Sequence, residues 1–221
     1  MTLFIISWPM FCTAFGLLLL FSFIMALQAR HFYTQDVVEK NFGIMDLELP
    51  ATALELVNLI KGIYKLPPGR SKKTVSALKA QLYIDFLFMP CAYGAIFILC
   101  MLVSAKMELH AGRMVFITLA YLQAVPWVCD IIENIYLLHK IRPDVTVSTD
   151  AAHNSYLRME YVKWGLALIA AICAIAALCY FWLAGKYDSR SLYYLAVIVA
   201  EIILFVILSK LFLKNKKEEL Q

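Results

Sequence analysis

Charged residues are scarce in this chain. They make up 16% of its 221 residues, whereas a soluble domain carries nearer a quarter. Apolar residues reach 62% and gather in blocks of about twenty, the length that a helix needs to cross a hydrocarbon layer about 30 Å thick. This composition excludes an ordinary soluble domain. No Gly/Ser-rich linker or internal repeat divides the chain, so we expect residues 1–221 to form a single membrane domain.

The sequence also lacks the short motifs that mark common catalytic sites. It contains no Walker loop and no GxGxxG, HExxH or GxSxG pattern. None of its six cysteines forms a CxxC pair or flanks a histidine at zinc-ligand spacing. We therefore predict no cofactor and no metal site, and we expect the cysteines to pack as small apolar side chains. Whether the chain is an enzyme stays open.

Five apolar blocks predict transmembrane helices, because a helix satisfies all of its backbone polar groups internally. The predicted spans are residues 3–27, 82–105, 114–138, 162–185 and 192–213. The first block lacks a basic flank and is too long for a cleaved signal peptide, so we count it as a membrane helix. The sequence thus predicts an all-α integral membrane bundle of about five transmembrane helices.

The Lys and Arg residues are distributed unevenly about these spans. One side of the membrane receives sixteen of the twenty, which lie in or beside segments 28–81, 139–161 and the C-terminal tail. Segments rich in Lys and Arg tend to stay in the cytoplasm. We therefore predict a multi-pass protein of the cell membrane with its N-terminus outside and its C-terminus in the cytoplasm. Because the basic residues adjoin the membrane, we expect no nucleic-acid partner.

The segment from about residue 50 to residue 65 predicts a cytoplasmic amphipathic helix. Apolar residues recur at helical spacing from Leu56 to Ile63, and Pro67-Pro68-Gly69 ends the segment. The apolar stripe either lies on the membrane surface or caps the bundle, and the sequence leaves both readings open. Basic residues in and after this segment are candidate contacts for anionic lipids of the bilayer: Lys61, Lys65, Arg70, Lys72 and Lys73.

Acidic residues inside the apolar blocks are the most informative feature, because hydrocarbon rejects charge and such residues usually face the bundle interior. The third block carries Asp130, Glu133 and Asn134 on or beside one helix face, and the second block carries Asp85. All four lie in the cytoplasmic half of the predicted spans, where they form one polar cluster if the two helices pack together. Pro126 predicts a kink nearby. Further candidate members are Gln123, Lys163 and Glu201.

Three stretches between about residues 40 and 140 form a recognisable pattern. They are the acidic apolar stretch Ile44–Leu49, the run Leu82–Phe88 followed by Tyr93, and the Asp-x-x-Glu-Asn helix that starts at Asp130. This pattern resembles a family of small uncharacterised bacterial membrane proteins. The resemblance implies a bacterial inner membrane, and it makes Asp85, Asp130, Glu133 and Asn134 the polar set that the family shares. It implies no activity.

The predicted cluster of carboxylates and an amide favours a binding role. We expect it to bind a lipid head group, a proton or a cation. Two alternatives stay open. The chain is a structural or assembly subunit whose acids meet a membrane protein partner or a second copy, or it is a membrane-embedded enzyme that acts on a lipid or isoprenoid substrate.

Overall fold

The computed structural model describes residues 6–36 and 38–213 of the chain. Helices dominate it, with 79% of the residues helical, and two short strands form a hairpin. In chain order the elements are α1 (Trp8–Ala29), β1 (Tyr33–Gln35), β2 (Glu39–Asn41), α2 (Met45–Glu48), α3 (Ala53–Lys65), α4 (Pro68–Ser104), α5 (His110–Leu122), α6 (Ala124–Lys140), α7 (Asp150–Leu183) and α8 (Arg190–Leu213).

Five helical segments of the described chain are long and apolar enough to cross a membrane. They are α1, α4, the α5–α6 pair, α7 and α8, which correspond in order to the five predicted spans. The predicted all-α membrane bundle is therefore confirmed, and so is the multi-pass class. Residues 3–5 of the first predicted span and the basic tail 214–221 lie outside the described residues.

Two of the spans begin earlier than hydropathy indicates. Helix α4 starts at Pro68 rather than residue 82, and α7 starts at Asp150 rather than residue 162. Hydropathy detects only the part of a helix that lies in hydrocarbon, whereas a helix continues into water wherever its backbone is capped and packed. Thr149 supplies such a cap for α7, because its hydroxyl accepts a hydrogen bond from the backbone N–H of Ala152.

The third span is interrupted at Gln123, where α5 ends and α6 begins. Pro126 has no backbone N–H, so the carbonyl of Leu122 loses its usual intrahelical donor. The break between the two helices lies three residues before Pro126, beside the predicted kink. It separates α5 from α6, which carries Asp130, Glu133 and Asn134.

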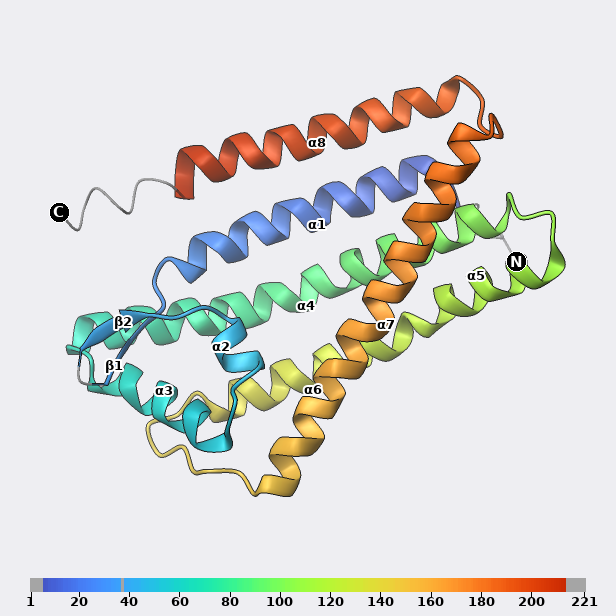
Figure 1. Ribbon diagram of the computed structural model, residues 1–221. Coiled ribbons are helices and arrows are strands. Elements are labelled where there is room, and N and C mark those ends of the chain that lie inside the picture. The colour runs from blue at the N-terminus through green and yellow to red at the C-terminus, as the bar shows by residue number, and fades with distance from the viewer. Residues whose placement is uncertain (1–5, 37, 214–221) are drawn as a thin grey trace, which may run out of the picture.

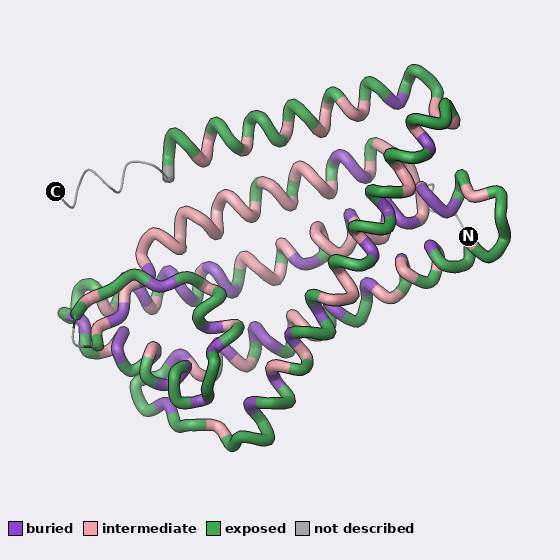
Figure 2. Tube along the Cα trace, in the orientation of Figure 1, coloured by how far each residue is buried: buried purple, intermediate pink, exposed green. Residues whose placement is uncertain are grey.

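The spans form an open array rather than a closed ring. Helices α8, α1 and α4 lie side by side with α1 in the middle, while α7 crosses and contacts α4 and α6 (Figure 1). Buried Ala170 and Ala174 let α7 approach α4 closely beside Cys100. Helix α8 packs on α1, and most of its surface is exposed, as Figure 2 shows. An exposed apolar helix of this kind suits contact with lipid.

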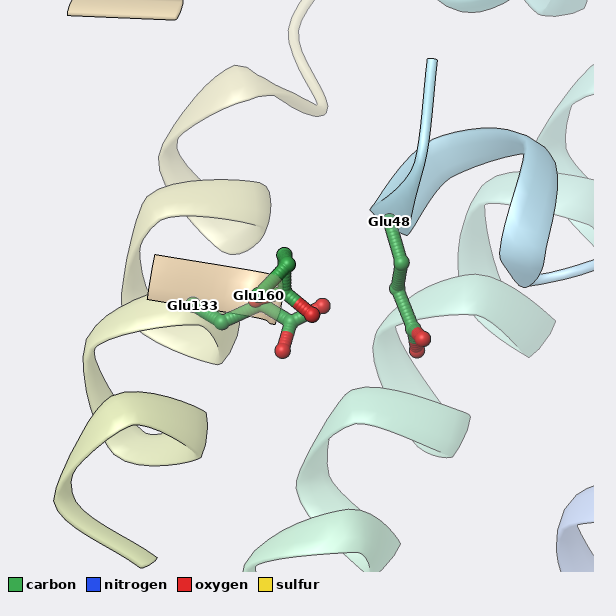
Figure 3. Close-up of side chains that lie close together, drawn as sticks. All are labelled: Glu48, Glu133 and Glu160. Atoms are coloured by element: carbon green, nitrogen blue, oxygen red, sulfur yellow. The ribbon is translucent and has the colours of Figure 1, made fainter. Parts of the chain in front are cut away.

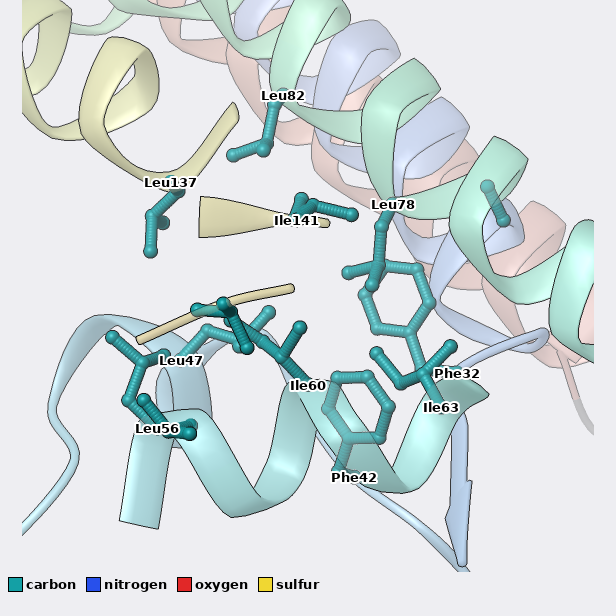
Figure 4. Close-up of a cluster of buried hydrophobic side chains, with 13 residues drawn as sticks. Phe32, Phe42, Leu47, Leu56, Ile60, Ile63, Leu78, Leu82, Leu137 and Ile141 are labelled. Atoms are coloured by element: carbon teal, nitrogen blue, oxygen red, sulfur yellow. The ribbon is translucent and has the colours of Figure 1, made fainter. Parts of the chain in front are cut away.

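At one end of the bundle, the β1–β2 hairpin, α2 and α3 form a small structure that we call the cap (residues 33–65). Thr52 caps α3 by accepting a hydrogen bond from the N–H of Glu55, at 3.1 Å. The apolar face of α3 then packs on the ends of α4 and α6 (Figure 4). The stripe predicted from Leu56 to Ile63 is therefore buried in the protein as a bundle cap instead of covering the membrane surface.

The hairpin was not predicted, because strands of three residues carry too little pattern to detect. Tyr33 pairs with Asn41, and Gln35 pairs with Glu39. The hairpin is held against α3 by the hydroxyl of Thr34, which donates to the carbonyl of Leu59 at 2.9 Å. Helix α2 packs on α3 within the cap, and its last residue, Glu48, approaches Glu133 of α6 and Glu160 of α7.

Candidate functional site

Lys163 of α7 is the centre of a buried charged cluster. Only 3% of this residue is exposed. Its ammonium Nζ lies 2.8 Å from Oδ1 of Asp130 and 2.5 Å from Oε2 of Glu160, and it also forms an ion pair with Glu133. A lysine without access to water needs such compensation, because burying an isolated charge is very costly.

The helical repeat of α6 and α7 explains why these groups meet. Asp130 and Glu133 are three residues apart on α6, and Glu160 and Lys163 are three residues apart on α7, so each pair occupies neighbouring positions on one helix face. The two helices pack together with these faces toward each other. Both glutamates are buried.

Helix α4 supplies a second side of the site. Asp85 accepts a hydrogen bond from the side-chain amide of Asn134, at 2.7 Å. The hydroxyl of Tyr93 donates to Oδ2 of Asp130 at 2.5 Å. Asp85 and Asp130 lie close enough to interact electrostatically. The acid of the second span therefore points toward those of the third, although no ion pair described for Asp85 joins it to Lys163.

The cap supplies a third carboxylate to the buried pair Glu133 and Glu160. Glu48, the last residue of α2, reaches down so that one oxygen from each of the three side chains lies within 4.8 Å of the others (Figure 3). Burial raises the pKa of Glu48 to about 7, against the ammonium of Lys163, which lowers it. The carboxylates of Glu160, Asp85 and Asp130 raise this pKa further.

We call this assembly the carboxylate cluster. Its members are Glu48, Asp85, Asp130, Glu133 and Glu160, with Lys163 among them. Two tyrosines complete its lining: Tyr93, as above, and Tyr156, whose hydroxyl donates to Glu133 at 3.4 Å. The ring of Trp164 also lies beside the ammonium, at 5.4 Å from its centroid. The cluster therefore joins α2, α4, α6 and α7.

No known protein family, curated protein or solved structure matches this chain. The resemblance to small bacterial membrane proteins therefore stays a prediction.

Most of the residues predicted for the site lie together. The structure brings together Asp85, Asp130, Glu133, Asn134 and Lys163. Gln123 is buried farther along the span and donates to the backbone carbonyl of Leu119. Glu201 lies on α8, where its carboxylate faces Gly16 of α1. No hydrogen bond or ion pair described for these two residues joins them to the cluster.

Sequence reasoning missed Glu48, Glu160 and Tyr156. Glu160 and Tyr156 precede the predicted start of the fourth span at residue 162, so hydropathy assigns them to the preceding loop. The spacing of three between Glu160 and Lys163 was the available signal, and it needed a longer helix to become visible. Glu48 lies in the acidic stretch Ile44–Leu49, which is part of the pattern behind the resemblance. The direction of its side chain depends on how the cap packs against the bundle, which the sequence does not show.

Chemically, the cluster is rich in hydrogen-bond acceptors and poor in positive charge. Carboxylate oxygens bind protons, ammonium groups and hard metal cations. The tyrosine hydroxyls donate to two of the carboxylates and so fix their positions. The buried part, Glu133 and Glu160, connects to the surface through Glu48, which is partly exposed. The three glutamates therefore place acidic groups from the cap into the interior of the bundle.

Proposed function

We propose that this membrane protein binds a small positively charged species, a proton or a metal cation, at the carboxylate cluster. The observation that carries the proposal is a surplus of negative groups, since five carboxyl groups accompany the single ammonium of Lys163. An uncompensated charge inside a membrane protein is costly. We infer that bound protons or a cation neutralise the surplus, and a cluster that exchanges either of them with the solution is a binding site.

The same surplus argues against the third ligand expected from the sequence, a lipid head group. A lipid phosphate would be repelled by the carboxylates. An amine head group would compete with the ammonium of Lys163, which already contacts Asp130, Glu133 and Glu160. A proton or a small metal cation can use a carboxylate oxygen that Lys163 leaves free, such as Oε1 of Glu160, and can approach through the partly exposed Glu48.

The structural alternative rests on the contacts of Lys163 across the α6–α7 interface. Its pairing with Asp130 and Glu133 fixes the register of the two helices, which is a known use of buried polar groups. The structural and the binding hypotheses rest on the same contacts. They differ in one respect, because a purely structural network exchanges neither protons nor cations with the solution.

The enzyme alternative is favoured by one cavity. A pocket of about 280 Å³ between α4 and the α5–α6 span is lined mainly by apolar groups and reaches Tyr93, whose hydroxyl contacts Asp130. An isoprenoid or acyl chain could lie there with its polar end near the carboxylates. A lipid that copurifies in stoichiometric amount, and is lost when Phe97 or Trp127 of the pocket is replaced by alanine, would support this alternative.

We propose a bacterial inner membrane as the setting, with the cap in the cytoplasm. The resemblance supports the first part, and the concentration of Lys and Arg on the cap side supports the second. In this orientation the carboxylate cluster opens toward the cytoplasm through Glu48. The ligand would then exchange with the cytoplasmic pool of protons or cations.

Infrared spectroscopy tests the binding proposal, because it distinguishes protonated carboxyl groups from carboxylates. In lipid nanodiscs, we expect carboxyl bands of the purified protein to respond to pH or to added divalent cations. Asp130→Asn and Glu133→Gln should each remove part of that response, whereas Asp144→Asn, at an exposed loop position, should leave the buried bands unchanged. If the protein is folded and no band of the cluster responds to either variable, the binding proposal is wrong and the structural alternative gains.

A further inference from the structure

Within the carboxylate cluster, three glutamates from three different helices converge on one point. Glu48 ends α2, Glu133 lies on α6 and Glu160 lies on α7, and Figure 3 shows their carboxyl ends at the same level. One oxygen from each lies within 4.8 Å of the other two. Separated segments thus place three acids together, although like charges repel at this distance.

Glu160 provides a second observation at this point of convergence. It is fully buried, with 0% of its surface exposed. Among the described residues, only one of its two carboxylate oxygens is paired. Oε2 lies near the ammonium of Lys163, while Oε1 has neither a hydrogen bond nor an ion pair in that part of the chain. Leaving a buried carboxylate oxygen without a partner is costly, so a cation beside it would remove a real penalty.

The spacing of the three oxygens fits a single metal ion. Cations with oxygen ligands hold them at about 2.0–2.6 Å, so oxygens up to about twice that distance apart can share one ion. All three ligands are carboxylates, which suit Mg²⁺, Mn²⁺ or Ca²⁺ better than metals that prefer nitrogen or sulfur. We propose that Glu48, Glu133 and Glu160 form a binding site for one divalent cation of this hard class.

Formal charge supports a divalent ion over a monovalent one. The three glutamates carry three negative charges when ionised, and Lys163 supplies one positive charge. A divalent cation supplies the remaining two within this group of four, while Asp130, which shares Lys163, and Asp85 accept hydrogen bonds from Tyr93 and Asn134. Asp130 keeps its own pairing with Lys163 and Tyr93, so it need not join the metal. The proposal rests on the proposed cation-binding function, and it departs from the sequence-based expectation of no metal, which relied on the lack of histidine and cysteine ligands.

Glu48 is the ligand that best suits a test. It is partly exposed at the end of α2, so replacing it perturbs the bundle less than replacing Glu133 or Glu160. Asp46 offers a matched control on the same helix, since it is exposed and its carboxylate only accepts from the N–H of Gly43. Asparagine at position 46 can still accept that hydrogen bond through its side-chain carbonyl.

The experiment measures Mn²⁺ binding to the full chain in nanodiscs, after removal of metal with a chelator, by electron paramagnetic resonance. We expect one saturable site from which Mg²⁺ or Ca²⁺ displaces Mn²⁺. Glu48→Gln should weaken the affinity at least about tenfold, as loss of a direct ligand should cost no less than loss of an outer-shell partner. Asp46→Asn should bind as the unmodified protein does.

Two results would overturn the metal site. One is the absence of saturable Mn²⁺ binding to the unmodified protein, a measurement that does not depend on how any variant folds. The other is equal weakening in Glu48→Gln and Asp46→Asn. If Mn²⁺ does not bind but the infrared carboxyl bands still respond to pH, the metal site fails and the cation-binding function stands as proton binding. If neither is seen, both proposals fail.

Discussion

The ammonium of Lys163 lies 2.8 Å from the carboxylate of Asp130, which belongs to the neighbouring helix α6, and both groups lie inside the bundle. Removing the positive partner leaves several buried carboxylates uncompensated. We expect Lys163→Met to lower the free energy of unfolding by about 3–5 kcal/mol at neutral pH, the range for breaking a buried ion pair. This loss of stability should be smaller at acidic pH, because protonation of the carboxylates removes the negative charge that Lys163 otherwise compensates. Chemical denaturation in detergent micelles measures both effects.

Lys79→Met is the matched control for that substitution. Lys79 lies on α4 but is exposed, and surface charges contribute about 0–1 kcal/mol. If both lysine substitutions lower the stability by the same small amount, Lys163 does not compensate the carboxylates, and the charge argument for a bound cation loses its basis.

The raised pKa of Glu48 predicts a specific dependence of stability on pH. Burial raises this pKa from 4.5 to about 7, so between these values the folded protein keeps a proton that the unfolded chain releases. The free energy of unfolding should therefore fall as the pH rises from about 4.5 to about 7. We expect Glu48→Gln to make this slope shallower, because glutamine has no proton to lose. Denaturation of the metal-free protein across this pH range measures the slope.

Asp144→Asn serves as the control for the pH experiment, since Asp144 is an exposed acid of the loop between α6 and α7. It should leave the slope unchanged. A slope that is the same in the unmodified protein and in Glu48→Gln would mean that the folded structure does not raise the pKa of Glu48.

The sequence predicted the part of the site that lies within single apolar blocks. Asp130, Glu133 and Asn134 are recognisable because acids in hydrocarbon are costly and because helical spacing places them on or beside one face. Lys163 is a candidate because it supplies a cation at the depth of these acids in the predicted spans. Glu201 satisfied the same cost argument but faces Gly16 on α1, because the rotation of α8 about its axis is set by packing that hydropathy does not contain.

The remaining members depend on contacts between distant segments. Glu160 precedes the apolar block of α7, so its membership required knowing that the helix extends to Asp150. Glu48 depends on the docking of the cap, in which Leu47 and Ile60 bury against Leu137 at the end of α6. No local pattern encodes that docking. The convergence that carries the metal proposal could therefore not be predicted without the structure.

The close approach of the hairpin to α3 depends on Gly62. A Cβ at this position would lie 2.2 Å from the hydroxyl of Thr34 and 2.8 Å from the backbone oxygen of Gln35. Alanine normally stabilises a helix relative to glycine by up to about 1 kcal/mol. At this position, however, the added methyl group would push against the backbone of Gln35, which cannot move without displacing β1. We therefore expect Gly62→Ala to destabilise the protein by about 1–3 kcal/mol, the usual cost of overpacking.

Gly69→Ala provides the comparison for the cap, because a Cβ there meets nothing within 4 Å. Limited proteolysis together with denaturation distinguishes the two variants. Gly62→Ala should expose residues 33–65 to cleavage, while Gly69→Ala should match the unmodified protein. Equal protection in both variants would show that the hairpin does not need this close contact.

Basic residues at the start of α4 predict a site for anionic lipid. A cavity of about 430 Å³ is lined there by Lys72, Lys73 and His31, among others, and both lysines are exposed. Native mass spectrometry of delipidated protein should show binding of anionic lipid that decreases when both lysines are replaced by glutamine. The double variant Arg113→Gln/Arg190→Gln removes two exposed charges at the far end of the bundle. Equal loss in both variants would indicate nonspecific attraction.

The predicted orientation places the cap and the C-terminus in the cytoplasm, because sixteen of the twenty Lys and Arg residues lie on that side. A reporter enzyme that is active only outside the cytoplasm should be inactive when fused after Gln221 and active when inserted at Met107, between α4 and α5. The opposite pattern would place Glu48 outside the cytoplasm. The carboxylate cluster would then exchange its cation with the external medium, where both the proton and the metal concentration differ.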